Sequence, residues 1–219
     1  MFRQVLSTHW KWAQLELGVY SVIAFVIPTA FMKAMAVPSG ANESTILSAM
    51  QGSVGVGIVI GALAFIAATT LSVRPWITDH ARGHAFALSL PIAWPTFVRL
   101  RFMAGATLLL VPAVAVWLGG SLASLALTYP ETLHAYPVSI ALRFLSGSLV
   151  FYSAIFAVQY IAGKRAPVIV AGTLAAILVL ELFGQGITGT SPVLAVWNAV
   201  TSWPGPFEVL TVRWMLIDV

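Results

Sequence analysis

The sequence contains no cysteine and few charged residues, and both shortages narrow the classes of protein it can encode. Without cysteine there is no disulfide, no thiolate metal site and no cysteine nucleophile. Charged residues make up 8% of the 219 residues and hydrophobic residues 59%, and the mean hydropathy is +0.94. These values lie well outside the composition of soluble globular domains. We therefore expect an integral membrane protein.

The sequence also lacks a basic cluster, although its net charge is +4 and its isoelectric point is near 9.8. The lysines and arginines are dispersed among the segments between apolar runs. Nucleic-acid binding usually relies on a clustered basic surface, so we expect no nucleic-acid partner. We interpret the dispersed cations as determinants of the orientation in the membrane. The lipid bilayer is expected to surround most of the chain.

Long apolar runs without strict alternation predict an all-α membrane protein, because one helical span needs about 20 apolar residues. We treat residues 1–219 as a single transmembrane domain with five spans. The chain ends where a sixth span could begin, so we expect either a missing or incomplete sixth span or a five-span variant. The five expected spans cover residues 17–37, 53–72, 102–127, 139–162 and 167–183.

Two flanking segments differ from the spans. Residues 1–16 mix charges with tryptophan, which predicts either a helix lying in the membrane interface or a plain extension of the first span. Residues 184–206 are broken by glycine and proline, and we expect a re-entrant or interfacial segment on the outer side.

The distribution of cations predicts the orientation. If the five spans alternate, three basic residues, Lys33, Arg143 and Arg213, fall on one side and all the others on the opposite side. Lysine and arginine favour the cytoplasmic side of short loops. We therefore expect a multi-pass membrane protein with a cytoplasmic N-terminus and a cytoplasmic loop at 73–101. The membrane is expected to be a bacterial cytoplasmic (inner) membrane.

The loop at 73–101 holds a histidine pair that suggests two interpretations. His80 and His84 lie four residues apart beside Asp79, and could share one face of a helix. A stable metal site usually needs three or four protein ligands, and only His9 could join them from a nearby segment. We therefore expect no metal site, and favour a solvated amphipathic helix over 77–88.

This helix is expected to lie along the membrane and to end at Pro91. Its polar residues Asp79, His80 and Arg82 would face a soluble partner, and its apolar residues would rest on the membrane. Proline is favoured in the first turn of a helix, so Pro95 is expected to start the third span. The basic residues that follow Pro95, Arg99 and Arg101, are expected to reach the headgroups. The residues of the preceding helix expected to contact the membrane are Trp76, Ile77 and Leu88.

The same loop resembles the permease subunits of ABC-2 type transporters. The shared pattern is an acidic residue, a glycine, an "L-x-LP-[IV]" element, and then "FV" and a basic residue leading into a span. The tryptophan-rich N-terminal segment, the broken segment near the C-terminus and the length are also similar. The residues that carry the resemblance are Asp79, Gly83, Leu88, Leu90, Pro91, Ile92, Phe97, Val98 and Arg101.

The resemblance implies a transport subunit that pairs with a second permease copy or a homologous permease and docks a separate ATPase subunit. The chain has no phosphate-binding "GxxxxGK[ST]" loop, so ATP and Mg would bind the partner ATPase, and this chain would not be an enzyme by itself. We expect an exporter. The alternative is a non-catalytic structural subunit of a larger membrane complex. The residues expected to couple to the ATPase are Asp79, His80, Arg82, Gly83, His84, Leu90 and Pro91.

Two further features predict packing or transport. Glycines at 52, 55, 57 and 61 are expected to form a small-residue face for a neighbouring helix. Glu181 is a carboxylate inside an apolar run, where a charge is costly unless it is paired or turned to a polar cavity. We expect Glu181 to cap the outer segment or to line a transport path, with Arg143 in the fourth span as the other path candidate but one helical turn away.

Overall fold

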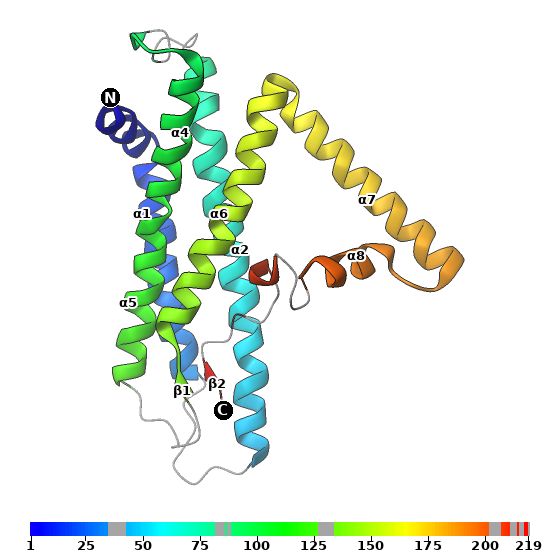
Figure 1. Cartoon of the computed structure of the whole chain (residues 1–219). Coiled ribbons are helices and arrows are strands. Elements are labelled where there is room, and N and C mark those ends of the chain that lie inside the picture. Colours follow the sequence, from blue (N-terminus) through cyan, green and yellow to red (C-terminus); the bar gives the residue numbers. More distant parts are fainter. Residues whose placement is uncertain are drawn as a thin grey trace. The chain divides into compact units, whose positions relative to one another are not determined.

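The computed structural model describes residues 1–34, 43–81, 86, 89–126, 134–201, 207–210, 214 and 217–218. Nearly all of them are helical (Figure 1). The chain divides into two compact units, Met1–Phe156 with Val212–Val219, and Ala157–Thr211. We describe each unit by itself.

The first unit is a helical bundle, and its described residues include five long helices in chain order. The last of them, α6, continues beyond Phe156 into the second unit. The bounds are α1 Phe2–Ala34, α2 Glu43–Ala81, α4 Trp94–Leu108, α5 Leu110–Ala126 and α6 Pro137–Ala162.

Four helical stretches among the described residues are long and apolar enough to cross a membrane: Phe2–Phe31, Gly55–Ala81, Trp94–Ala126 and Pro137–Ala162. This confirms the helical, membrane-type fold in its coarse form, but with four such helices where the sequence predicted five. The fifth predicted span falls in α7 (Ala166–Thr188), whose apolar part, Ala171–Gly186, is shorter than the other four.

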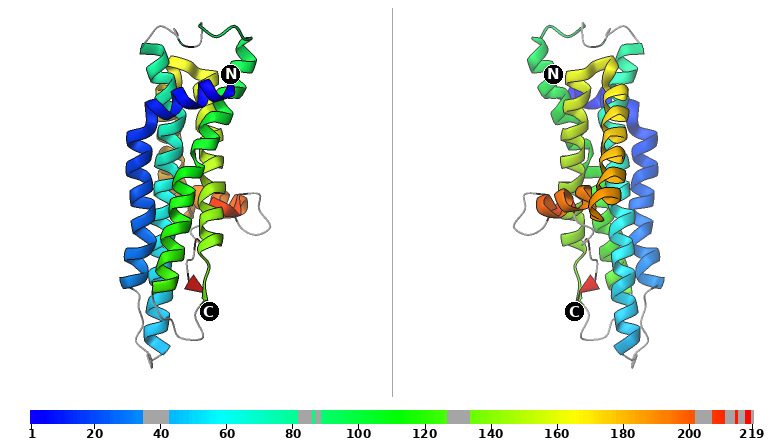
Figure 2. Two further views of the ribbon diagram at one scale, coloured as in Figure 1. Left: turned by 90° about the vertical axis from the view of Figure 1, so that its left-hand side faces the viewer. Right: turned by 90° about the vertical axis from the view of Figure 1, so that its right-hand side faces the viewer.

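The first helix changes direction along its length. Figure 2 shows its N-terminal turns, in dark blue, lying across the bundle, while the rest of α1 runs along the bundle. It is nevertheless a single helix from Phe2 to Ala34, with Pro28 inside it. The N-terminal segment is therefore a continuous extension of the first long helix that also lies across the others.

The third long stretch is interrupted at Leu109, between α4 and α5. Pro112 explains the break, because a proline cannot donate a backbone hydrogen bond and its ring collides with the carbonyl four residues earlier. Leu109 and Ala113 still donate to the carbonyls of Gly105 and Leu109, at 3.3 Å each. The two pieces therefore continue each other with only a local irregularity.

The C-terminal residues return to the first unit. Trp214 is buried at 2% exposure in the same apolar core as Phe144 and Ile60. A short antiparallel pair of strands joins β1 (His134–Ala135) to β2 (Ile217–Asp218). Where the sequence suggested the start of a sixth span, the described residues form a short 3-10 helix, Glu208–Leu210, the buried Trp214 and the strand β2.

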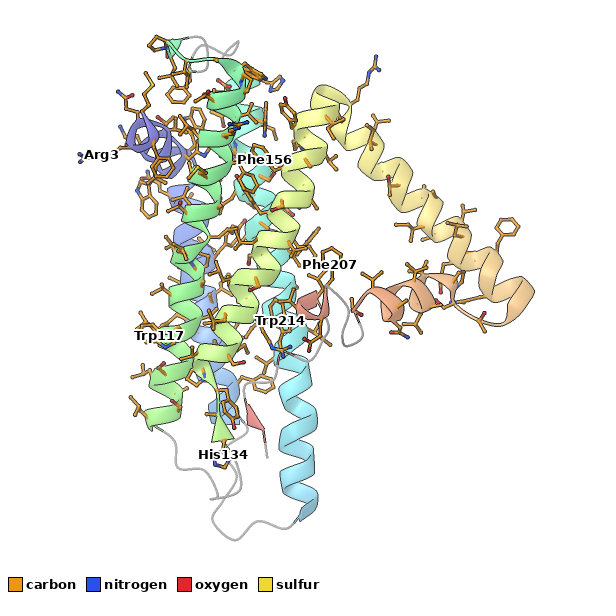
Figure 3. The ribbon with its side chains drawn as sticks, viewed as in Figure 1. Arg3, Trp117, His134, Phe156, Phe207 and Trp214 are labelled. Atoms are coloured by element: carbon orange, nitrogen blue, oxygen red, sulfur yellow. The ribbon has the colours of Figure 1, made fainter. Side chains whose placement is uncertain are left out.

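Two apolar clusters fill the bundle at different levels. One surrounds Phe144 and Trp214, and the other surrounds Tyr152, Phe156 and Trp76. Figure 3 shows Phe156 and Trp214 at separate heights along the helices. The Phe156 cluster lies near the end where α2 finishes and α4 begins, and it packs beside the polar groups described below.

Two glycines that the sequence did not single out lie where helices pack closely. A Cβ at Gly119 of α5 would collide with the Phe25 backbone of α1, and one at Gly105 would collide with Tyr152. In contrast, a Cβ at Gly55 or Gly61 would meet no neighbouring helix among the described residues, whereas Gly57 of the same predicted series is buried. Small residues permit the close approach of two helices but do not require it.

We expect Gly119→Ala to destabilise the first unit by about 1–3 kcal/mol, because the added methyl group displaces the α1 backbone. The matched change Gly61→Ala meets nothing, and should stabilise the protein by roughly 0.5–1 kcal/mol by lowering the backbone entropy of the unfolded chain. Free energies of unfolding in detergent micelles measure both. Equal effects of the two substitutions would contradict the close contact of α1 with α5.

Candidate functional site: a buried ion pair and its surroundings

An ion pair joins the last turn of α2 to the middle of α4. Nη1 of Arg101 donates to Oδ2 of Asp79 at 3.2 Å. The two side chains are only 1% and 0% exposed. Burying two charges is costly unless they pair and find further favourable contacts. Burial of this pair therefore costs free energy that the contacts around it in the described bundle have to offset.

Aromatic rings stabilise the arginine of this pair. The Arg101 guanidinium carbon lies 4.2 Å from the centre of the Trp76 ring and 5.6 Å from that of Phe97. Such cation–π contacts replace part of the lost hydration. Trp76 precedes Asp79 by three residues and Phe97 precedes Arg101 by four, so each helix presents its charge and its aromatic ring on one face.

Further polar side chains are buried near the pair. Tyr152 of α6 donates from its hydroxyl to the carbonyl of Phe102 at 3.2 Å and is fully buried. His9 is 2% exposed, and its ring stacks on Trp12 with centroids 6.0 Å apart. Within the described part of the chain, neither ring nitrogen of His9 has a hydrogen-bond partner.

A chain of aromatic rings connects the N-terminal segment to this site. Trp12 of α1 contacts Phe86, with ring centroids 5.7 Å apart, and Phe86 contacts Phe97 at 6.2 Å. Phe86 lies between α2 and α4, in the loop that the sequence singled out. Phe86 therefore contacts both α4 and the N-terminal segment of α1.

The predicted orientation of Asp79 is wrong. The sequence placed Asp79 on a solvated face, Trp76 on the membrane and Arg101 at the headgroups, but all three are buried. Arg99 is exposed, as expected of a cation at a helix end. Helical periodicity showed which residues share a face of α2, but it could not show that a cation from α4 lies opposite that face.

The remaining coupling candidates differ in exposure. His80 is half-buried, with Nδ1 2.8 Å from the carbonyl oxygen of Trp76. Leu90 is half-buried and Pro91 is exposed. Arg82, Gly83 and His84 lie outside the described residues.

Metal binding finds no support in the described residues. Within them, no three side chains of histidine, aspartate or glutamate come together in a way that could hold a metal ion. His84, one of the two histidines that suggested a metal, lies outside those residues. The Nδ1 contact of His80 with a backbone carbonyl already employs one nitrogen of its ring.

Glu181 holds two helices of the second unit together. Its Oε2 accepts from the backbone N–H of Val193 at 3.3 Å, at the N-terminus of α8 (Pro192–Thr201), and its Oε1 accepts from Gln185 at 2.6 Å. Ser191 accepts from the N–H of Leu194 at 2.9 Å, as an N-cap does. Glu181 therefore makes the contacts of a capping residue.

The turn between the two helices also needs glycine. Gly189 ends α7 with φ of 65°, a left-handed conformation that glycine adopts without strain, and its N–H donates to Gln185 at 3.2 Å. A Cβ at Gly184 would collide with the ring of Pro192. Arg143, the other path candidate, is a half-buried residue of α6 in the first unit.

Comparisons of the chain with protein-family models, with curated proteins and with solved structures gave no match. Sequence reasoning missed His9 and Tyr152 as members of the buried cluster. One signal for the ion pair was present, since Asp79 and Arg101 are opposite charges beside apolar runs, where charges usually pair.

We expect removal of one partner of the ion pair, by Asp79→Leu or Arg101→Met, to destabilise the bundle by about 3–5 kcal/mol, because a lone buried charge remains. The double variant should lose much less than the sum of the two single losses. A double-mutant cycle of unfolding free energies measures this coupling. The Glu16–Arg74 pair, at 3.2 Å but 26% and 52% exposed, is the control and should contribute about 0–1 kcal/mol. Additive losses at Asp79 and Arg101 would contradict the pairing.

For Glu181, we expect Glu181→Leu to weaken the N-terminus of α8 by about 1 kcal/mol, because the backbone N–H of Val193 loses its acceptor. Glu181→Gln keeps an acceptor oxygen and should retain most of the cap. Amide hydrogen exchange across residues 192–201 reports the difference. If both variants protect these amides equally, Glu181 does not cap α8.

Proposed function

We propose that the chain is the membrane subunit of an ATP-driven transporter of the ABC-2 type, working as an exporter with a separate ATPase subunit. The observation that carries this proposal is the position of the Asp79–Arg101 ion pair, which clamps together the two helices on either side of the 82–93 segment. A loop held in this way moves with both helices. A force applied to the loop by a partner would therefore reach α2 and α4 together.

The N-terminal segment supports the same function. It lies across the bundle and contacts the loop through Trp12 and Phe86 (Figure 2). Movement of the loop would also act on α1. Transport between two permease copies requires several helices to move together, and this contact links a third helix to the loop.

In this proposal the exposed surface that contacts the ATPase consists of the loop residues that follow Asp79 in the chain. Pro91 and Ser89 are exposed, while Asp79 holds the base of the loop from inside. Arg82, Gly83 and His84 remain candidates for contact with the ATPase. The role of Asp79 thus changes from contacting the ATPase to anchoring the loop.

A second candidate function is a non-catalytic subunit of a larger membrane complex. One observation favours it: α7 and α8 expose apolar side chains on most of their surface, including Leu178, Leu182 and Phe183 at 62–64%. Such a surface needs lipid or other membrane helices around it. The proteins that purify with the chain separate the two candidates.

We expect an ATPase subunit to purify with the chain from native membranes, and Gly83→Trp to reduce its recovery about tenfold, a loss of about 1.4 kcal/mol of binding. Mass spectrometry of the purified complex measures this recovery. Gly186→Trp is the matched control, because Gly186 is exposed, its Cβ would meet no neighbour and it lies outside the loop. Recovery of pigment or redox subunits without an ATPase would instead support the structural subunit. Equal recovery of the ATPase with both variants would exclude docking at Gly83.

A further inference from the structure

Two clefts flank the N-terminal segment of α1. The first has a volume of about 610 Å³ and is largely polar on the helix side, where Arg3, Gln4, Ser7 and Thr8 line it; Phe86, Ser89 and Leu90 line the opposite side. It is open at the surface, and its size falls within the usual range for ligand sites.

The second cleft is smaller and apolar. Its volume is about 330 Å³, and Leu6 and Trp10 of α1 face Leu108 of α4 and Val111 of α5 across it. Arg3 and Ser7 line this cleft as well. Residues 3, 6, 7 and 10 have the spacing of one helical face, so a single stripe of α1 presents a cation and a hydroxyl beside two apolar side chains.

We propose that the paired clefts bind one phospholipid with an anionic headgroup. The phosphate contacts the Arg3 guanidinium and the Ser7 hydroxyl, where the two clefts meet. One acyl chain lies in the apolar cleft against Leu6, Trp10 and Val111. The site is independent of the transport function proposed above.

The charge of the residues that line the two clefts determines which type of lipid headgroup they favour. Among the described residues that line the two clefts, Arg3 is the only charged one, and none is acidic. Figure 3 shows its side chain at the outer edge of the bundle, directed away from the helices, where a headgroup can reach it. A guanidinium binds phosphate through two parallel hydrogen bonds, and an anionic lipid gains further from the positive charge.

The apolar lining of the second cleft favours a lipid over a free phosphate as the ligand. Free phosphate would use Arg3 and Ser7 but leave Leu6, Trp10 and Val111 without a role. Tryptophan is enriched at the depth of lipid headgroups, which suits Trp10 at the mouth of the apolar cleft. A lipid uses both the cation and the apolar wall.

The test is native mass spectrometry of the purified full chain with phosphatidylglycerol, an anionic lipid, and phosphatidylcholine as its zwitterionic counterpart. We expect preferential retention of phosphatidylglycerol, which Arg3→Ala lowers about fivefold, the effect of one basic residue at a membrane surface. Lys11→Ala is the control, because Lys11 is an exposed cation of the same helix that lines neither cleft. This variant should stay close to the parent chain.

A second pair of variants tests the acyl chain. Thr107 is exposed and lines the apolar cleft, so Thr107→Trp should fill the cleft and lower lipid retention by a similar factor. Met103, one turn earlier and also exposed, lies outside the cleft, and Met103→Trp should have no effect. Hydrogen exchange of the parent chain and all variants shows whether each one keeps its fold.

Three outcomes would overturn the site. Equal losses with Arg3→Ala and Lys11→Ala would indicate general attraction of anionic lipid to the surface. Loss with Arg3→Ala but none with Thr107→Trp, together with competition by inorganic phosphate, would indicate an anion site without an acyl chain. Equal retention of the two lipids would exclude headgroup selection by Arg3.

Discussion

The buried ion pair between Asp79 and Arg101 is the constraint that organises one end of the bundle. Two unpaired charges in an apolar interior would cost several kcal/mol each. The chain therefore has to bring the last turn of α2 and the second turn of α4 together before either can be buried. Trp76 and Phe97 then cover the guanidinium, and the Phe97 ring belongs to the aromatic contacts that reach Phe86 and Trp12.

This arrangement gives the loop between α2 and α4 a rigid base. The helix before the loop and the helix after it are fixed to each other, while Ser89 and Pro91 remain exposed. A segment anchored in this way can pass a displacement to the bundle, whereas a loop on two independent helices would absorb it by bending. The interior of the bundle and the exposed loop thus have complementary roles in the proposed transporter.

The second unit also contains a charged side chain in an apolar helix, and hydrogen bonds stabilise it there. Glu181 lies in an apolar helix, yet its carboxylate accepts hydrogen bonds from Val193 and Gln185, because the chain turns back at Gly189 and brings the start of α8 to it. Hydrogen bonds of this kind satisfy backbone groups that the start of a helix otherwise leaves open. The arrangement accounts for a charge in an apolar stretch without invoking a transport path.

Composition and hydropathy alone determined that the protein is helical and suited to a membrane, because about 20 consecutive apolar residues leave few alternatives. Hydropathy also located most of the long helices. For Glu181 the sequence left two roles, capping and a transport path, and the structure shows the hydrogen bonds of a capping residue. Helical periodicity could place Asp79 and Trp76 on one face of α2, but it could not say whether water, lipid or another helix meets that face. Only the tertiary structure decided this, because the partner, Arg101, comes from a separate helix. The same reason explains the glycines: Gly119 and Gly61 are alike in sequence, and only the approach of α1 to one of them makes a side chain there costly.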